Sequence, residues 1–277
     1  MNPKPIIISV APNGARKSKK DFPTLPISPQ EILEEAGRCV NAGATLFHLH
    51  VRDDLGGHSL DTARYREAID LIKAAYGDRL IIQASTETVE IYEPKDQMRL
   101  VTELVPPSAS IGVRELVPNA AHEMAAANFL AWSVNNKILL QYICYSSDDI
   151  VYFSDLLNRE VIPKTSVLFL LFVLGKKTGQ KADVAELAPM LKTMRDVLVD
   201  VNLEWAVCAF GDQELPCMLE AVREGGHVRI GFENNHMMND GTVAKNTAEL
   251  VRQFVITVKN RPIALFNEAK FLLESQQ

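Results

Sequence analysis

Two histidines separated by one residue are the first side chains in this sequence that could perform chemistry. The segment 45–51 reads TLFHLHV, so His48 and His50 alternate with apolar residues. Side chains two positions apart in a β-strand share a face, and both imidazoles would therefore point the same way. Paired imidazoles suit a divalent metal ion such as zinc. The pair predicts a metal site, and the alternative is two hydrogen-bonded core histidines.

A second alternating segment supplies an acidic partner. Residues 227–233 read HVRIGFE, which places His227, Arg229 and Glu233 on the face opposite the apolar positions 228, 230 and 232. Two histidines and one glutamate leave part of a zinc coordination shell for water or substrate, which is typical of a catalytic site. Arg229 could hold a carboxylate or stabilise an enolate. The alternative is a structural ion pair between Arg229 and Glu233.

A scaffold must bring residues 48–50 and 233 together, and the remaining sequence predicts one. Eight apolar segments are predicted strands, each followed by a predicted helix. The strands are 5–10, 45–51, 79–84, 108–112, 138–143, 166–174, 204–209 and 227–232, and the helices are 29–42, 61–76, 95–104, 119–133, 147–159, 183–199, 213–224 and 243–259. This alternation indicates a parallel sheet covered by helices. The count favours a single α/β domain over 1–277, a (β/α)8 TIM barrel, above an open doubly wound sheet.

The barrel would place the candidate ligands at one end. Strand 8 is separated from strand 2 by strand 1 alone, and both ligand segments end at the C-terminal rim, where barrel enzymes hold their active sites. The segment Ser28-Pro29-Gln30-Glu31 has the features of a helix-capping box. It sets the end of a long first loop, residues 11–27, on this same rim.

Composition limits the classes of function. Hydrophobic residues make up 47% of the 277 residues and charged residues 23%, enough for a large core. A net charge of −6 argues against a nucleic-acid partner. The longest apolar run, 167–174, is too short to cross a membrane, and no secretory signal is visible at the N-terminus. The four scattered cysteines predict reduced core residues in a cytoplasmic protein.

Several segments together resemble the β-keto acid cleavage enzyme family. The matching segments are VAPNGA at 10–15, LPISPQEI at 25–32, HLHVRD at 48–53, QAST at 83–86, GGHVRIGFEN at 225–234 and the later Asn246. HLHVRD and GGHVRIGFEN are specific in combination, and neither is specific alone.

The resemblance implies a (β/α)8 barrel with one zinc ion held by His48, His50 and Glu233, assembled as a homotetramer. The implied reaction is an exchange in which a β-keto acid and acetyl-CoA give acetoacetate and a new acyl-CoA. Zinc acidifies the carbon between the carboxylate and the keto group, and the carbanion attacks the thioester. The CoA thiolate then adds to the original keto carbon, and the C–C bond breaks.

The resemblance also implies roles for residues around the metal. Arg229 matches an arginine that assists deprotonation and charge stabilisation, and Ser85 matches a residue that contacts the substrate carboxylate. Ser110 and the backbone of Asn13 and Gly14 are expected to line the same pocket.

Asn234 departs from the family, which commonly has an aspartate there, paired with the arginine. A neutral amide does not accept a proton near neutral pH. Another group must then accept it, and the candidates are Glu87, Asp53 and Glu115, each of which could instead be a solvated carboxylate or a helix cap. Glu87 ranks first because it follows Ser85 on the same side of the pleat.

Two further segments bear on the substrates. Family members that accept an aminated keto acid have a glutamate in the fifth strand, whereas residues 140–145 read LQYICY and contain no carboxylate. A buried ammonium would lack a partner, so we expect a neutral or apolar tail. Residues 16–20 read RKSKK, and these cations could meet the phosphates of CoA or be a solvated loop.

Two other functions compete with the exchange reaction. One is a metal-dependent barrel lyase or hydrolase that acts on a keto acid without CoA, which Asn234 keeps open. The other is a non-catalytic ligand-binding barrel, which the metal triad and Arg229 disfavour. The histidines at 58, 122 and 236 show no partner in the sequence and are expected at the surface or in loops.

Overall fold

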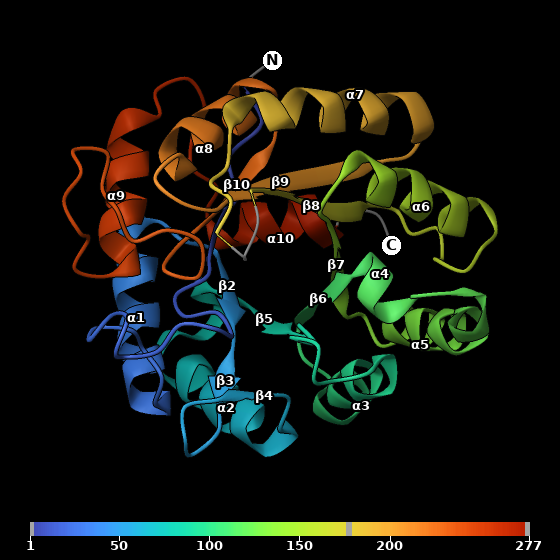
Figure 1. The fold of residues 1–277 in the computed structure, drawn as a ribbon, viewed down its shortest axis with the longest axis horizontal. Coiled ribbons are helices and arrows are strands. Elements are labelled where there is room, and N and C mark those ends of the chain that lie inside the picture. The colour runs from blue at the N-terminus through green and yellow to red at the C-terminus, as the bar shows by residue number, and fades with distance from the viewer. Residues whose placement is uncertain (1–2, 176–178, 275–277) are drawn as a thin grey trace.

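Eight parallel strands close into a barrel in the computed structural model, which describes residues 3–175 and 179–274 (Figure 1). Around the barrel the strands are β1 (Ile8–Val10), β2 (Leu46–Leu49), β5 (Ile81–Ser85), β6 (Ser108–Gly112), β7 (Leu139–Cys144), β8 (Leu168–Leu174), β9 (Leu203–Ala209) and β10 (His227–Ile230). β1 pairs with both β2 and β10, which completes the ring. The predicted (β/α)8 TIM barrel is confirmed.

Helices follow the strands and cover the outside of the barrel. The longer ones are α1 (Pro29–Ala42), α2 (Thr62–Tyr76), α3 (Pro94–Leu104), α5 (Glu123–Asn135), α6 (Ser147–Asn158), α7 (Leu187–Val197), α8 (Glu214–Arg223) and α9 (Thr247–Thr257). The predicted capping box at the start of α1 is present. The Glu31 N–H donates to Ser28 Oγ at 3.3 Å, and the Ser28 N–H donates to the Glu31 carboxylate at 3.0 Å.

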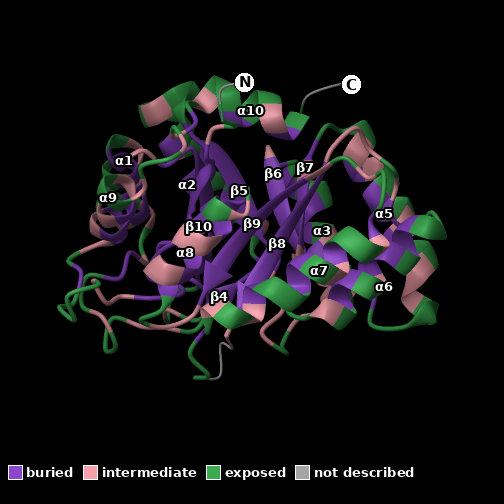
Figure 2. Cartoon of the chain, turned by 90° about the horizontal axis from the view of Figure 1, so that it is seen from above, coloured by how far each residue is buried: buried purple, intermediate pink, exposed green. Residues whose placement is uncertain are grey.

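The structure also contains elements that were not predicted. They include the short hairpin β3 (Val51–Arg52) and β4 (His58–Ser59), the one-turn helix α4 (Val113–Leu116) and the final helix α10 (Phe266–Glu274). α10 lies at one end of the barrel and the β3–β4 hairpin at the other (Figure 2). Ala269 and Leu273 of α10 pack in the same apolar cluster as the inward-facing Ile7, Leu46 and Ile81. The helix therefore closes the N-terminal end and leaves the C-terminal end for the site.

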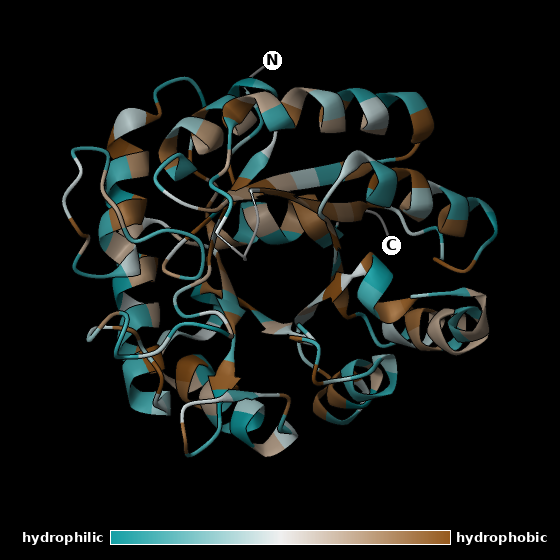
Figure 3. Ribbon diagram, in the orientation of Figure 1, coloured by the Kyte–Doolittle hydropathy of each residue, from teal (hydrophilic) through white to brown (hydrophobic). Residues whose placement is uncertain are grey.

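Alternation along the strands divides the core into two apolar clusters. In β8, Leu170 and Phe172 pack in the large cluster beneath the helices, whereas Phe169 and Leu171 belong to the smaller cluster inside the barrel. The surrounding helices carry bands of hydrophobic and hydrophilic residues, as expected for one packed face and one exposed face (Figure 3). Strands buried on both faces explain the continuous apolar runs in the sequence.

The four cysteines are buried, as predicted, and none of them forms a disulfide. They are Cys39, Cys144, Cys208 and Cys217. Among the described residues, no helix combines the length and apolarity needed to cross a bilayer.

The chain turns sharply after β10 at Gly231, which has φ 149°. A Cβ at this position would lie 2.3 Å from the carbonyl oxygen of Ala11. The close approach lets the Glu233 N–H donate to that carbonyl at 3.0 Å, so the end of β10 is held against the end of β1. A glycine is required here for both reasons.

We expect Gly231→Ala to lower the free energy of unfolding by about 2–4 kcal/mol, because it adds backbone strain and a clash with a backbone atom. The matched control is Gly241→Ala, at φ 85° with nothing within 4 Å of its added Cβ, which should cost about 1 kcal/mol. Urea unfolding measures both. Equal losses in the two variants would show that the approach to Ala11 is unimportant.

Candidate active site

Three ligand atoms converge at the C-terminal rim. His48 lies in β2, His50 follows that strand, and Glu233 follows the turn after β10. The two imidazole Nε2 atoms are 3.0 Å apart. Glu233 Oε2 lies 3.4 Å from His50 Nε2 and 3.6 Å from His48 Nε2. Strand alternation and the adjacency of β1 to β2 and β10 produce this meeting, as the sequence predicted.

These three residues fit a divalent metal ion. They form a cluster whose ligand atoms all lie within 4.8 Å of one another, and all three residues are buried. Glu233 Oε2 is inaccessible to solvent yet has no hydrogen-bond partner among the described residues. A buried carboxylate oxygen without a donor is costly unless a cation satisfies it. Imidazole and carboxylate ligands suit zinc and other first-row ions.

The protonation states of His48 and Glu233 are those that metal ligands need. Burial, reinforced by the nearby Arg229 charge, lowers the pKa of His48 well below its usual value, so the imidazole is neutral. Burial alone would raise the pKa of Glu233, but Arg229 and the two histidines outweigh it and hold the pKa well below its usual range. Glu233 is therefore ionised.

Arg229 contacts the Glu233 oxygen that does not face the two histidines. Its Nη2 lies 3.1 Å from Glu233 Oε1 and donates to Cys208 Sγ at 3.3 Å. The structural ion pair that the sequence left as an alternative is thus present. It uses Oε1 and leaves Oε2 directed at His48 and His50, so an ion pair and a ligand role are compatible.

A cavity of about 230 Å³ opens beside the cluster. Five of the predicted site residues line it, namely Asn13, Gly14, Glu87, Glu233 and Asn234. Its wall also contains Arg16, Lys17, Lys181 and Phe210. The cavity gives a small molecule access to the cluster.

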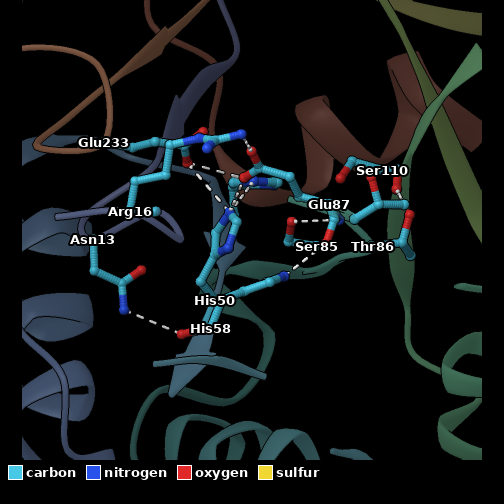
Figure 4. Close-up of polar contacts among 12 residues, drawn as sticks. Asn13, Arg16, His50, His58, Ser85, Thr86, Glu87, Ser110 and Glu233 are labelled. Atoms are coloured by element: carbon cyan, nitrogen blue, oxygen red, sulfur yellow. Dashed lines mark hydrogen bonds and ion pairs between the residues drawn. The ribbon is translucent and has the colours of Figure 1, made fainter. Parts of the chain in front are cut away.

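Glu87 is the candidate base that lies at the cavity. Its carboxylate places Oε2 4.0 Å from His50 Nε2 and Oε1 3.7 Å from Arg16 Nη2 (Figure 4). The other two candidates have structural contacts elsewhere. Asp53 accepts from the backbone of the β3–β4 turn, and Glu115 accepts from the Thr88 N–H and the Gln97 amide.

Ser85 and Ser110 were expected at the cavity but are not among the residues that line it, and both are buried around the same rim. Ser85 Oγ accepts from the Glu87 N–H at 3.3 Å. The hydroxyl of Ser110 and both amide atoms of Asn234 are buried without a hydrogen-bond partner among the described residues. Asn13 uses its Nδ2 to donate to the carbonyls of Pro26 and His50.

His58 was expected at the surface or in a loop, and that prediction is wrong, because the residue is buried in strand β4. The residue is 8% exposed, its Nε2 lies 2.6 Å from the Glu87 carbonyl oxygen, and its ring centroid is 5.5 Å from that of His50 (Figure 4). The β3–β4 hairpin folds it back onto the site. The turn residues in DDLGG, at 53–57, were the available signal for this hairpin.

Arg52 was also missed. Its buried guanidinium donates to the carbonyl oxygens of Gly14, Lys17 and Gly56 at 2.7–3.0 Å, which fastens the first loop to the hairpin. Gly14, at φ 61°, then lies so close to Glu233 that a Cβ would be 2.5 Å from its Cγ. The loop thereby limits the positions that the Glu233 side chain can take.

Three of the four cations at residues 16–20 have partners within the protein. Arg16 lies beside Glu87, Lys17 donates to the Phe232 carbonyl at 2.6 Å, and Lys19 pairs with Glu31. Arg16, Lys19 and Lys20 are nevertheless exposed to solvent, and Lys17 is partly buried.

Fold and site together define a TIM-barrel enzyme with a His-His-Glu centre at its C-terminal rim. The chain matches the beta-keto acid cleavage enzyme family over residues 5–274, and it belongs to that family. Membership makes it an acyltransferase that cleaves C–C bonds.

The relatives of this chain have names that refer to different substrates. The 3-keto-5-aminohexanoate cleavage enzyme of Acetoanaerobium sticklandii is 30% identical over 97% of each chain. The 3-oxoadipate:acetyl-CoA acetyltransferase of Cupriavidus necator is 27% identical over 98% of this chain and 95% of that one. The solved structure of ObcA superposes with a TM-score of 0.71 at 14% identity, covering 91% of this chain and 65% of that one, and shows the fold alone.

Glu214, at the start of α8, is a buried carboxyl that the sequence did not single out. It accepts from the Gly231 N–H at 3.1 Å and from the Asn235 amide at 3.3 Å, beneath the turn that carries Glu233. Burial raises the pKa of Glu214 from 4.5 to about 8, despite these donors. The folded protein therefore keeps this carboxyl protonated at neutral pH.

The raised pKa predicts a pH-dependent stability. Between pH 4.5 and about 8 the unfolded chain loses the Glu214 proton and the folded chain keeps it, so this contribution to stability falls as pH rises. Glu214→Gln removes that loss. The melting temperature of the variant minus that of the wild type should increase from about pH 5 to about pH 9. A difference that stays constant with pH would contradict the assignment.

Proposed function

We propose that this protein is a zinc-dependent β-keto acid cleavage enzyme that converts a β-keto acid and acetyl-CoA into acetoacetate and a new acyl-CoA. The observation that carries the proposal is the convergence of His48, His50 and Glu233 beside a cavity that Glu87 lines, in a chain of this family. The reaction joins the acetyl carbonyl carbon to the methylene carbon of the keto acid. It breaks the bond from that methylene to the original keto carbon, whose acyl group leaves on the CoA sulfur.

His48, His50 and Glu233 would hold the zinc ion. When bound there, a divalent ion polarises the substrate oxygens and makes the methylene between them more acidic. Glu87 accepts the methylene proton, because its carboxylate is the proton acceptor beside His50 that is not itself a ligand. Arg229 remains charged inside the barrel, and its fixed charge stabilises the negative charge that develops when the proton leaves.

Neutral side chains would orient the substrate. Ser85 and Ser110 would donate to the substrate carboxylate. They are register partners in β5 and β6, and the Ser110 hydroxyl is buried without a partner in the described structure. The Asn234 amide, likewise without a partner there, offers one donor and one acceptor at the cavity where a carboxylate would add charge. Asn13 and Gly14 complete this wall.

A substrate tail without an amine fits this cavity best. The two carboxylates on its described lining are Glu87 and Glu233, and each has a guanidinium beside it, from Arg16 and Arg229. A cationic tail would meet carboxylates that already have positive neighbours. We therefore propose a neutral or apolar tail. A homotetramer, a cytoplasmic setting and attraction of CoA phosphates to residues 16–20 stay predictions.

Acetoacetate should form when the zinc-loaded protein is given acetyl-CoA and a β-keto acid with an apolar or hydroxylated tail. The same assay with an aminated tail should give a kcat/KM at least about tenfold lower, because a desolvated ammonium without a partner costs more than 1.4 kcal/mol. His48→Ala, which removes a proposed ligand, should abolish the product. Equal turnover of aminated and plain tails would refute the tail assignment. Cleavage of the keto acid without acetyl-CoA would favour a lyase or hydrolase.

Glu87→Gln should lower kcat about 10²–10⁴-fold, because an amide cannot accept the substrate proton. Asp53→Asn is the matched control, since it removes a nearby carboxylate but keeps the Oδ1 acceptor of the hairpin turn. Steady-state kinetics with zinc content measured for each protein separates loss of base from loss of metal. A kcat for Glu87→Gln within about threefold of the wild type would assign the base elsewhere.

A further inference from the structure

Gln83, in β5, lies next to His48 inside the barrel and has polar side chains around it. Its register partners are His48 in β2 and Ser108 in β6, so the three side chains share one level of the barrel. Gln83 Oε1 is 2.8 Å from His48 Nδ1. Its Nε2 lies 3.2 Å from Gln141 Oε1 and 3.3 Å from Ser108 Oγ. The four residues are at most 2% exposed, so water does not compete for these bonds.

The orientation of the Gln83 amide follows from Ser108. A serine hydroxyl has a single hydrogen, and Ser108 donates its hydrogen to the backbone carbonyl of Leu139 at 2.8 Å. Ser108 Oγ can then only accept a hydrogen from Gln83. Gln83 must therefore direct its NH2 group to Ser108 and its carbonyl oxygen to His48. The Leu139 carbonyl can only accept a hydrogen bond. It therefore fixes the donor and acceptor roles along the hydrogen-bond chain Leu139–Ser108–Gln83–His48, which we call the relay.

The relay determines which nitrogen of His48 carries the hydrogen. The carbonyl oxygen of Gln83 can only accept, so His48 Nδ1 must be the donor. In a neutral imidazole the other nitrogen, Nε2, then has a lone pair, and it is the atom that points at His50 and Glu233. We propose that Gln83 is a positioning residue that holds His48 in the Nδ1–H tautomer, the one whose Nε2 can bind a metal ion. This inference rests on the metal centre of the proposed function.

His50 has no acceptor at its Nδ1 comparable to Gln83. Its Nδ1 is buried without a partner among the described residues, and its Nε2 is 3.0 Å from His48 Nε2. Because His48 Nε2 has no hydrogen, His50 must donate from Nε2 across this contact in the metal-free protein. Metal binding then requires the His50 hydrogen to move to Nδ1. The two proposed ligands therefore differ. His48 already has the tautomer that binds a metal ion, whereas His50 must change its tautomer.

The first test is zinc affinity, measured by competition with a chromophoric chelator. Gln83→Leu removes the acceptor and should weaken zinc binding about 10–100-fold, the usual effect of losing a hydrogen-bond partner of a metal-ligating histidine. Ser108→Ala removes the anchor and should have a smaller effect, about several-fold, because Gln141 still accepts from Gln83. Ser9→Ala is the control, since Ser9 is an equally buried barrel serine without a partner in the described structure. Its affinity should match the wild type.

The second test observes the tautomer in the metal-free protein. Nitrogen-15 NMR distinguishes protonated from unprotonated ring nitrogens, and His48→Ala identifies the His48 signals. His48 should carry its hydrogen on Nδ1 in the wild type and should lose this preference in Gln83→Leu. A hydrogen on Nε2 of His48, or zinc affinities of Gln83→Leu and Ser108→Ala equal to that of Ser9→Ala, would overturn the inference. A wild-type protein that binds no zinc would instead overturn the proposed metal centre, and the NMR result would still decide the tautomer.

Discussion

An ionised carboxylate has to lie inside the barrel, 3.4 Å and 3.6 Å from the Nε2 atoms of two imidazoles, and much of the structure serves to hold it there. Burial opposes the negative charge of Glu233. The Arg229 guanidinium, itself buried, offsets this cost by a hydrogen bond to Oε1 and leaves Oε2 directed at the histidines. The turn at Gly231 and the close approach of Gly14 fix the backbone and side chain of Glu233 from two sides. Replacing either Glu233 or Arg229 with a neutral residue would leave the other as an uncompensated buried charge.

The arrangement of strands explains why distant residues form one site. β1 lies between β2 and β10, so segments nearly 180 residues apart in the chain become neighbours at the same rim. α10 closes the opposite end, and the cavity opens where the loops that follow the strands gather. The barrel itself is shared with structures such as ObcA at 14% identity. A fold alone does not specify a reaction, so function has to be argued from the residues of the site.

Most of the barrel could be predicted from the sequence because its signals are local. Alternation at 45–51 and 227–233 gave the faces of two strands, and the capping box gave the start of α1. The parts that were missed depend on contacts between distant segments. His58 looked solitary because its partner is the carbonyl of Glu87, and Arg52 has carbonyl partners that leave no pattern of charge in the sequence. Glu214 gained its raised pKa from burial, which no local motif reveals.

The most direct test of the central claim is X-ray absorption spectroscopy at the zinc edge on protein loaded with one equivalent of zinc. A zinc ion held by His48, His50 and Glu233 should show a shell of nitrogen and oxygen ligands at about 2.0–2.2 Å with the outer-shell scattering of two imidazoles. In a His50→Ala variant the imidazole scattering should fall by half. A sulfur shell, or a spectrum without imidazole scattering, would contradict a metal centre at His48, His50 and Glu233.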